Sequence, residues 1–341
     1  MREPDFENNI KQVFLKKRPA RPTLFEFLIS DEAEEFLSGY KLKDDSPEER
    51  IKRKIKAYYN GGYDYVPFIL GDLWFTNGGV ETEETYSLNQ GAVITDRDSF
   101  DEYPWPDMDR VNYGTLDIVK KYLPDGMKIL SYCPNGILEN VIALCGYENL
   151  CFMLADDRGL AERIFGEVGT RIERFITETL KDPAVGIAFC NDDWGFNSST
   201  MLSHDDLRKL IYPYYKRLAE KTHEAGKVIG MHSCGNFSGI FSELYDVIGI
   251  DGKHSYEDSI MPVEKAYDMY GGKIAVLGGI DMNFLSRKGD EEISARCKKM
   301  LEKTEEKGGY ALGSGNSIAK FVPLKNYVAM IKTVYPEFKL V

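Results

Sequence analysis

The stretch Lys227-Val-Ile-Gly-Met-His-Ser-Cys-Gly-Asn236 follows an amphipathic segment at residues 203–225. Its apolar first half is typical of a short buried strand, and the glycine near its end is typical of a turn. The same alternation recurs along the chain, with short apolar runs at residues 65–70, 127–132, 185–190, 227–231, 247–250, 273–277 and 310–312. Strands that alternate with helices predict a parallel sheet, and seven or eight such units predict an α/β fold of the (β/α)8 TIM-barrel type.

Two regions depart from this alternation. Residues 1–60 carry apolar side chains at helical spacing, notably over 23–28 and 47–59, which predicts an N-terminal helical arm packed on a barrel of residues 61–341. Residues 76–106, after the first strand, predict an inserted hairpin that turns near Gly91. We expect this insertion to stand beside the barrel mouth, with exposed aromatic side chains that dock a partner: Trp74, Phe75 and Trp105.

Composition excludes several classes of protein. The net charge of -12 argues against nucleic-acid binding and against anionic membrane surfaces. No stretch of about 18 apolar residues predicts a membrane span. The six cysteines contain no CxxC pair, which argues against a disulfide framework. These features predict a soluble cytoplasmic protein with reduced thiols.

Polar or glycine-rich clusters follow the predicted strands. In a TIM barrel the loops after the strands gather on one face, and that face carries the chemistry. The clusters are found at residues 71–72, 133–136, 191–195, 232–236, 254–258, 278–281 and 313–317. We therefore expect them to surround one site.

His232 and Cys234 stand out among these clusters. Residues two apart on a strand point to the same side, so an imidazole and a thiol meet beyond the strand end. Such a pair is half of a zinc site. The alternative is a buried cysteine beside a histidine that hydrogen-bonds to the backbone.

Each remaining cluster also has a structural interpretation. Asp192 and Asp193 follow a strand, where aspartate often caps a helix. The glycine turns at 278–279 and 313–315 allow close packing of strand on helix, although their N–H groups also suit a phosphate or carboxylate. His254 and Glu257 are either site residues or solvated loop residues.

Several of these segments together resemble the uroporphyrinogen decarboxylase superfamily. The resemblance rests on residues 232–236, on Gly279-Ile-Asp281, on the run 308–317 and on the run 322–330. Within that superfamily, the H-x-C motif resembles the corrinoid-dependent methyltransferases, of the methylcobamide:thiol type. The arginine-rich N-terminal motif of true uroporphyrinogen decarboxylases has only a weak counterpart here, at Arg18 and Arg21.

The resemblance implies Zn²⁺, which activates a thiol to take a methyl group from a methylated corrinoid, methylcobalamin, on a carrier protein. Those enzymes usually supply a third zinc ligand, a cysteine, from the glycine-rich loop that here reads Gly313-Ser-Gly-Asn316. A carboxylate can take its place, with Glu257 and Asp193 as the candidates. If the small-molecule acceptor is tetrahydrofolate, the metal becomes less necessary.

The chain thus resembles a zinc-assisted methyltransferase with three groups of candidate residues. The candidates are Asp72, Asp193 and Asp281 for catalysis, Asn135, Trp194, Gly279, Ser314 and Asn316 for substrate binding, and His232, Cys234 and Glu257 for the metal. One alternative is metal-free decarboxylation of a tetrapyrrole, in which Asp72 or Asp192 holds a pyrrole. Another is a non-catalytic protein that binds a corrinoid or its carrier.

Overall fold

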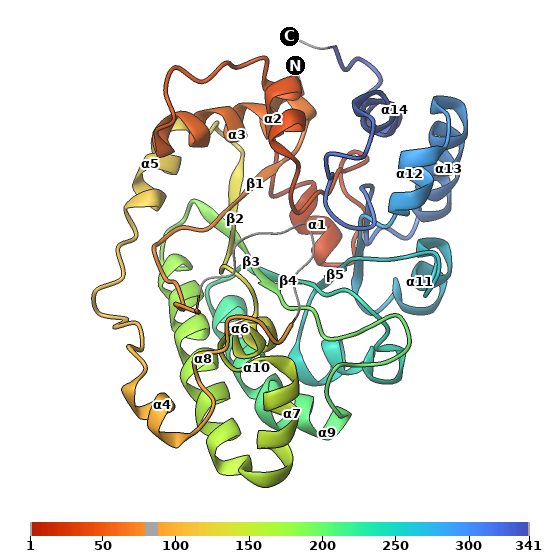
Figure 1. The fold of residues 1–341 in the computed structure, drawn as a ribbon. Coiled ribbons are helices and arrows are strands. Elements are labelled where there is room, and N and C mark those ends of the chain that lie inside the picture. The colour runs from red at the N-terminus through yellow and green to blue at the C-terminus, as the bar shows by residue number, and fades with distance from the viewer. Residues whose placement is uncertain (1, 79–87, 340–341) are drawn as a thin grey trace.

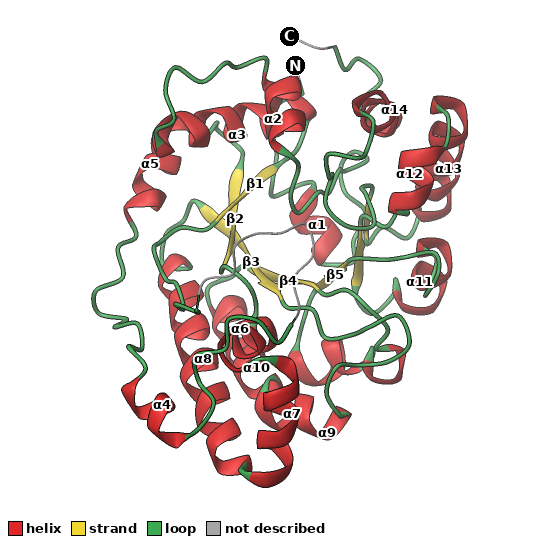
Figure 2. Ribbon diagram, viewed as in Figure 1, coloured by secondary structure: helices red, strands yellow, loops and turns green. Residues whose placement is uncertain are grey.

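The computed structural model describes residues 2–78 and 88–339, and its centre is one parallel sheet. Seven strands follow one another in the order of the sequence: β1 Tyr65–Phe68, β2 Lys128–Tyr132, β3 Val185–Asn191, β4 Val228–His232, β5 Gly252–His254, β6 Ala275–Leu277 and β7 Tyr310–Ala311. Figure 1 labels β1 to β5. Helices surround the strands (Figure 2). The α/β architecture is therefore confirmed, and the seven parallel strands in the described part of the chain, rather than eight, are consistent with a TIM-type barrel.

The helices lie mainly between these strands. Those before or just after the first strand are α1 Ile10–Phe14, α2 Asp31–Ser38, α3 Pro47–Gly61, α4 Arg97–Glu102 and α5 Gly114–Tyr122. Those of the middle of the chain are α6 Ile137–Cys145, α7 Tyr147–Asp156, α8 Arg158–Thr179, α9 His204–Leu210 and α10 Tyr212–Glu224. A 3-10 turn η1 Ser238–Ile240, a π-helical turn η2 Leu244–Ile248, α11 Val263–Tyr270, α12 Met282–Arg287, α13 Asp290–Thr304 and α14 Leu324–Val334 complete the set.

Strand register places the functional loops at one level. Asn191 of β3 pairs with His232 of β4, which in turn pairs with His254 of β5. Because the three strands are parallel, the residues that follow these positions leave the sheet side by side. The expected convergence of loops at the carboxyl ends of β3, β4 and β5 follows from this register.

The prediction of a helix at residues 23–28 is wrong. The segment is extended, with parallel bridges from Leu24 to Leu312 and from Ile29 to Ile318. The N–H of Phe25 donates to the carbonyl of Leu312 over 2.8 Å. Both faces of the segment are buried, so its apolar residues do not alternate and their spacing also fits a helix.

The N-terminal residues fill the barrel as well as cover it. Phe14 of α1 lies against Gly230 of β4 and Gly252 of β5. Phe25 is fully buried, and its ring lies 5.2 Å from that of His254. Phe27 lies 5.4 Å from the ring of His232. The region expected to be an arm therefore supplies part of the core beneath the strand ends.

Two further expectations need correction. The run 247–250 is not a strand, because the π-helical turn η2 covers its first half and β5 begins only at Gly252. The segment 203–225 is two helices rather than one. Pro213 lies in the first turn of α10, where its missing N–H costs nothing, so the chain restarts a helix there.

The insertion at 76–106 has a different local structure from the one expected. Residues 79–87 lie outside the described residues, and the remainder contains α4 and no strand. The N–H of Gly78 donates to the carbonyl of Gly91, so the two ends of the loop meet. Of the three aromatic residues expected to be exposed, Trp74 is 61% exposed, but Phe75 is buried and packs edge-on against Trp105.

None of the described helices is, by itself, long and apolar enough to cross a membrane. The α6–α7 pair passes that test only when its two helices are taken together, and they are bent by 94°. All six cysteines lie in the described part of the chain, and all are free thiols.

We predict that Phe25→Ala lowers the free energy of unfolding by about 3–5 kcal/mol, since truncating a buried phenylalanine leaves a cavity. Urea denaturation followed by circular dichroism measures this change. Phe321→Ala is the control, because Phe321 is 65% exposed and its loss should change stability by less than about 0.5 kcal/mol. Equal, small effects of both substitutions would show that residues 23–30 are only a surface arm.

Candidate metal centre

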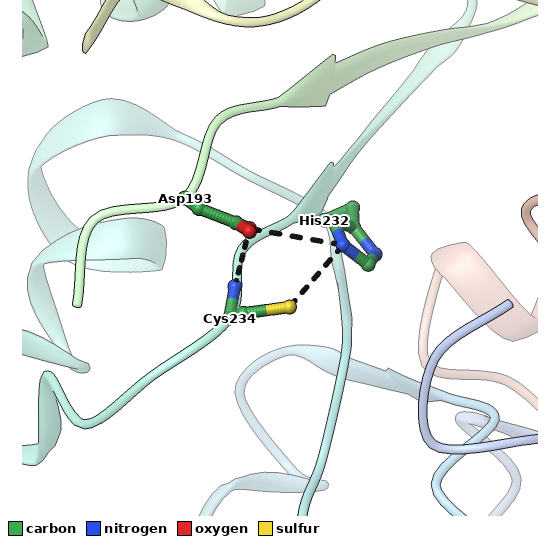
Figure 3. A group of neighbouring side chains, drawn as sticks. All are labelled: Asp193, His232 and Cys234. Atoms are coloured by element: carbon green, nitrogen blue, oxygen red, sulfur yellow. Dashed lines mark hydrogen bonds and ion pairs between the residues drawn. The ribbon is translucent and has the colours of Figure 1, made fainter. Parts of the chain in front are cut away.

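Three side chains meet beyond the ends of β3 and β4 (Figure 3). His232 is the last residue of β4, Cys234 follows two residues later, and Asp193 is the second residue after β3. His232 Nε2 lies 3.5 Å from Cys234 Sγ and 3.7 Å from Asp193 Oδ1. Asp193 Oδ1 also accepts the backbone N–H of Cys234 over 2.7 Å, which ties the two loops together.

The three donors fit a zinc ion in both chemistry and spacing. Nitrogen, sulfur and carboxylate oxygen are all zinc ligands, and their ligand atoms lie within 4.8 Å of one another. Tetrahedral zinc with bonds of about 2.0–2.3 Å separates its ligands by roughly 3.3–3.8 Å. The two distances from His232 Nε2 lie in that range. Three protein ligands would leave a fourth position for a substrate, as in catalytic zinc sites.

Burial keeps the imidazole neutral and the thiol protonated when no cation is bound. Desolvation lowers the pKa of His232, so that its ring is uncharged at neutral pH and retains a lone pair for a cation. Burial, and then the nearby Asp193 carboxylate, raise the pKa of Cys234 to about 12. A bound cation would reverse this preference, since a coordinating thiol loses its proton.

Two polar side chains contact the sulfur from the opposite side of the cluster. Asn316 Nδ2 donates to Cys234 Sγ over 3.3 Å, and the hydroxyl of Ser255 lies 3.3 Å from the same atom. Glu257 is not one of the three clustered ligands. It lines a neighbouring cavity with Asp281 and Asn316. The carboxylate of the cluster is therefore Asp193, one of the two that the sequence left open.

A buried lysine lies next to the cluster. Lys253, on β5, is 2% exposed, and its Nζ donates to the backbone carbonyls of Ser233, over 2.9 Å, and of Ser255. The ammonium also lies over the rings of Phe237 and Tyr256, at 5.0 and 4.8 Å from their centroids. Desolvation lowers the pKa of Lys253 to about 8. It thus holds both loops that approach the sulfur.

Asp192 has a different role from its neighbour Asp193. It is fully buried, and its carboxylate accepts the N–H groups of Leu138 and Glu139 at the start of α6. It also accepts the Tyr215 hydroxyl and the indole N–H of Trp194. Burial raises the pKa of Asp192 to about 6, so the carboxyl is largely ionised at neutral pH.

Trp194 is fully buried and bonds to the carboxylate of Asp192, so its role in the site is structural support. Gly136 is required at the start of α6, because a Cβ there would overlap the side chain of Asp192. The helix cap expected of the Asp192–Asp193 pair exists, but it belongs to α6 and not to the helix that follows.

The other predicted residues are spread around the strand ends. Asp281 caps α12 through the N–H of Phe284 and accepts the N–H of Asp258. Gly279 donates its N–H to the carbonyl of Ser314, and both residues are buried. Asn135 and Asp72 are exposed, and Asp72 accepts the N–H of Asn112.

Sequence reasoning missed Lys253 and Glu26 and left His254 undecided. His254 Nδ1 lies 2.9 Å from Nδ1 of His232, and both rings are buried. Glu26 is fully buried and accepts both the N–H and the hydroxyl of Ser314, over 2.7 and 2.6 Å. A single charged residue within an apolar run was the available signal for Glu26, whereas Lys253 lies in the polar run 251–254, where a charge does not stand out.

We predict that the two adjacent aspartates separate stability from metal binding. Asp192→Ala should lower the free energy of unfolding by about 3 kcal/mol or more, because each buried donor left unpaired costs about 1–3 kcal/mol. Asp193→Ala removes one partly exposed carboxylate, so it should cost only about 1 kcal/mol but weaken metal binding. Urea denaturation and zinc titration measure the two effects. A similar loss of stability in both variants would contradict these roles.

Comparisons with known proteins address the family and the fold of the chain. The model of the uroporphyrinogen decarboxylase (URO-D) family matches residues 89–336. The structure resembles a methyltransferase from Methanosarcina mazei, with a TM-score of 0.70, 16% identity, and coverage of 99% of this chain and 100% of that chain. It also resembles a protein from Listeria monocytogenes described as a vitamin-B12-independent methionine synthase, with a TM-score of 0.51, 13% identity, and coverage of 94% and 99%. No curated protein sequence matches the chain. The family match covers more than half of the sequence, and the chain therefore belongs to the uroporphyrinogen decarboxylase family.

Proposed function

We propose that the protein is a methyltransferase that moves a methyl group from a methylated corrinoid, carried by a partner protein, to a thiol or to tetrahydrofolate. One observation carries this proposal: Asp193, His232 and Cys234 bring oxygen, nitrogen and sulfur donors to one point at the strand ends. Such a donor set is suited to zinc, and the decarboxylation that names the family was expected to be metal-free. The likeness in fold to the methyltransferase from Methanosarcina mazei supports the same reaction class.

Asp193, His232 and Cys234 would hold the metal, and each has a second contact that orients it. Zinc bound there would supply a Lewis acid that keeps an acceptor thiol as thiolate near neutral pH. Asn316 donates to Cys234 Sγ and also lines a cavity of about 460 Å³ with Glu257 and Asp281. We assign the methyl acceptor to this cavity, because Asn316 lines it and also contacts the sulfur.

The corrinoid partner is proposed to approach over aromatic side chains around the strand ends. Trp74, Phe196 and Phe321 are exposed by 61%, 43% and 65%, and they lie on the segments that follow β1, β3 and β7. Large exposed aromatic side chains commonly contribute to interaction surfaces. A macrocycle held on another protein would meet these side chains before it reaches the donors.

We predict that Cys234→Ser lowers bound zinc and methyl transfer together, each at least tenfold, because a serine hydroxyl is a much poorer zinc ligand than a thiolate. Atomic emission measures zinc per chain, and the absorbance of methylcobalamin follows transfer to a thiol or to tetrahydrofolate. Cys151→Ser is the matched control, since Cys151 is an exposed free thiol. Full activity of a zinc-free preparation would refute the thiol-activation mechanism.

The same preparation distinguishes the decarboxylase alternative. We expect no conversion of uroporphyrinogen to coproporphyrinogen under conditions in which methyl transfer proceeds. Decarboxylation by zinc-free protein would replace our proposal. Binding of a corrinoid carrier with neither reaction would indicate a non-catalytic protein.

We also predict that Trp74→Ala weakens transfer from a carrier-bound methylcobamide several-fold more than transfer from free methylcobalamin. The reason is that only the carrier needs a protein docking surface. Steady-state rates with the two donors measure the ratio, and Phe152→Ala, an exposed aromatic substitution on α7, is the control. Equal losses with both donors would remove Trp74 from the docking surface.

A further inference from the structure

The two ring nitrogens of His232 face different neighbours. Nε2 faces Cys234 and Asp193, whereas Nδ1 faces His254 Nδ1 over 2.9 Å. A neutral imidazole carries its single proton on one nitrogen and a lone pair on the other. Which nitrogen of His232 is bare therefore decides whether the ring can bind a cation at the Asp193–Cys234 side.

The surroundings of His254 determine which nitrogen of His232 is bare. Nε2 of His254 lies 3.3 Å from the backbone carbonyl of Ser314, and a carbonyl can only accept a hydrogen bond. The ring of His254 is fully buried, and a buried charge is costly, so the ring carries a single proton. A neutral His254 with its proton on Nε2 has a lone pair on Nδ1.

That lone pair requires a donor from His232. At 2.9 Å the two Nδ1 atoms are at hydrogen-bond distance, and one of them must carry the proton. Since Nδ1 of His254 accepts, Nδ1 of His232 donates. Nε2 of His232 is then bare. Its separation of 3.7 Å from Asp193 Oδ1 is too long for an N–H···O bond, which agrees with a nitrogen that carries no proton.

The far end of this chain of bonds is anchored by the N-terminal segment. Glu26 accepts the N–H and the hydroxyl of Ser314, and the hydroxyl of Tyr65 bonds to both backbone groups of Glu26. Glu26, Ser314, Tyr65 and His254 are all fully buried. Water therefore does not compete with these bonds, and the Ser314 carbonyl is fixed in direction.

We propose that His254, anchored through Ser314 by Glu26, is a positioning residue that holds His232 with its proton on Nδ1 and its Nε2 lone pair directed at Asp193 and Cys234. The inference takes the identity of the cation from the proposed function, but the arrangement of protons is a property of the metal-free protein. Second partners of this kind fix the ring of a ligand histidine, and their loss typically costs 10–100-fold in metal affinity.

The proton positions can be read directly by NMR. The chain has only four histidines, so long-range ¹H–¹⁵N correlation of metal-free protein with ¹⁵N-labelled histidine resolves every ring, and His204→Gln and His223→Gln assist the assignment. We expect a protonated Nδ1 and a bare Nε2 for His232, and the reverse for His254. A protonated Nε2 on metal-free His232 would overturn the inference without any substitution at the site.

Variants of His254 test whether this residue determines the tautomer of His232. His254→Leu removes the acceptor, so His232 should populate both tautomers and zinc affinity should fall 10–100-fold in competition with a chromophoric chelator. His254→Asn places a carbonyl oxygen near the position of Nδ1 and should lose less. His223→Leu is the control, because His223 pairs with Asp251 on the outer surface. Unchanged tautomer and affinity in His254→Leu would overturn the proposal.

Glu26 provides a test from the other end of the chain of bonds. Glu26→Gln keeps an oxygen that accepts the N–H of Ser314, whereas Glu26→Leu does not. We expect Glu26→Gln to retain the wild-type tautomer and zinc affinity, and Glu26→Leu to lose both if it folds. Equal retention in a folded Glu26→Leu would remove Glu26 from the proposal.

The outcomes separate this inference from the proposed function. Wild-type protein that binds no zinc but shows a bare Nε2 on His232 would refute the zinc mechanism and keep the positioning role. Zinc binding together with a protonated Nε2 of His232 in the metal-free protein would refute the positioning role and keep the zinc mechanism.

Discussion

The pairing of residues 23–30 with the chain after β7 is the constraint on which the site depends. A sheet of seven strands leaves β1 and β7 unpaired with one another in the described structure, and exposed strand edges are open to unwanted pairing. The bridges from Leu24 to Leu312 and from Ile29 to Ile318 occupy the edge of β7 and its extension. The same segment brings Phe25, Glu26 and Phe27 beneath His254 and His232. Closure of the fold and support of the site are therefore one interaction.

The buried ionisable residues around the site share a second property. Asp192, Glu26 and Lys253 are buried, and none of them forms an ion pair in the described structure. Burial also raises the pKa of Glu26 to about 8, so that its carboxyl is mostly protonated at neutral pH. Each of the three instead bonds to backbone groups: Asp192 to the start of α6, Glu26 to Ser314, and Lys253 to the carbonyls of Ser233 and Ser255. A buried charge with fixed backbone partners resists any movement that would break its hydrogen bonds, because the cost of an unpaired buried charge is high. Loops that in most proteins are mobile are here held by hydrogen bonds to buried ionisable side chains.

Much of this arrangement could be predicted from the sequence, and the limits have physical causes. Strand alternation placed His232 and Cys234 on one side. From the sequence, Glu257 was assigned to the metal and Asp193 to catalysis, whereas the donors that cluster in the structure are those of Asp193, His232 and Cys234. Both carboxylates follow strands, and periodicity cannot measure distances across the barrel mouth. The prediction of a helix at residues 23–28 failed because a segment buried on both faces shows no alternation of apolar and polar residues. Because the extended path of this segment was not predicted, neither the position of Glu26 nor its bond to Ser314 could be foreseen.

The link between Glu26 and Ser314 joins residues 288 positions apart. A ribosome releases the first of these long before it has made the second, so the N-terminal segment has no partner for most of synthesis. Its apolar side chains must remain uncommitted until the final strand is complete, which is the situation in which chaperones are most useful and misassembly is most frequent. His232 is synthesised earlier, but the bonds through Ser314 that orient its ring form last. Binding of the proposed metal would consequently be an event of the finished chain and not of the nascent one.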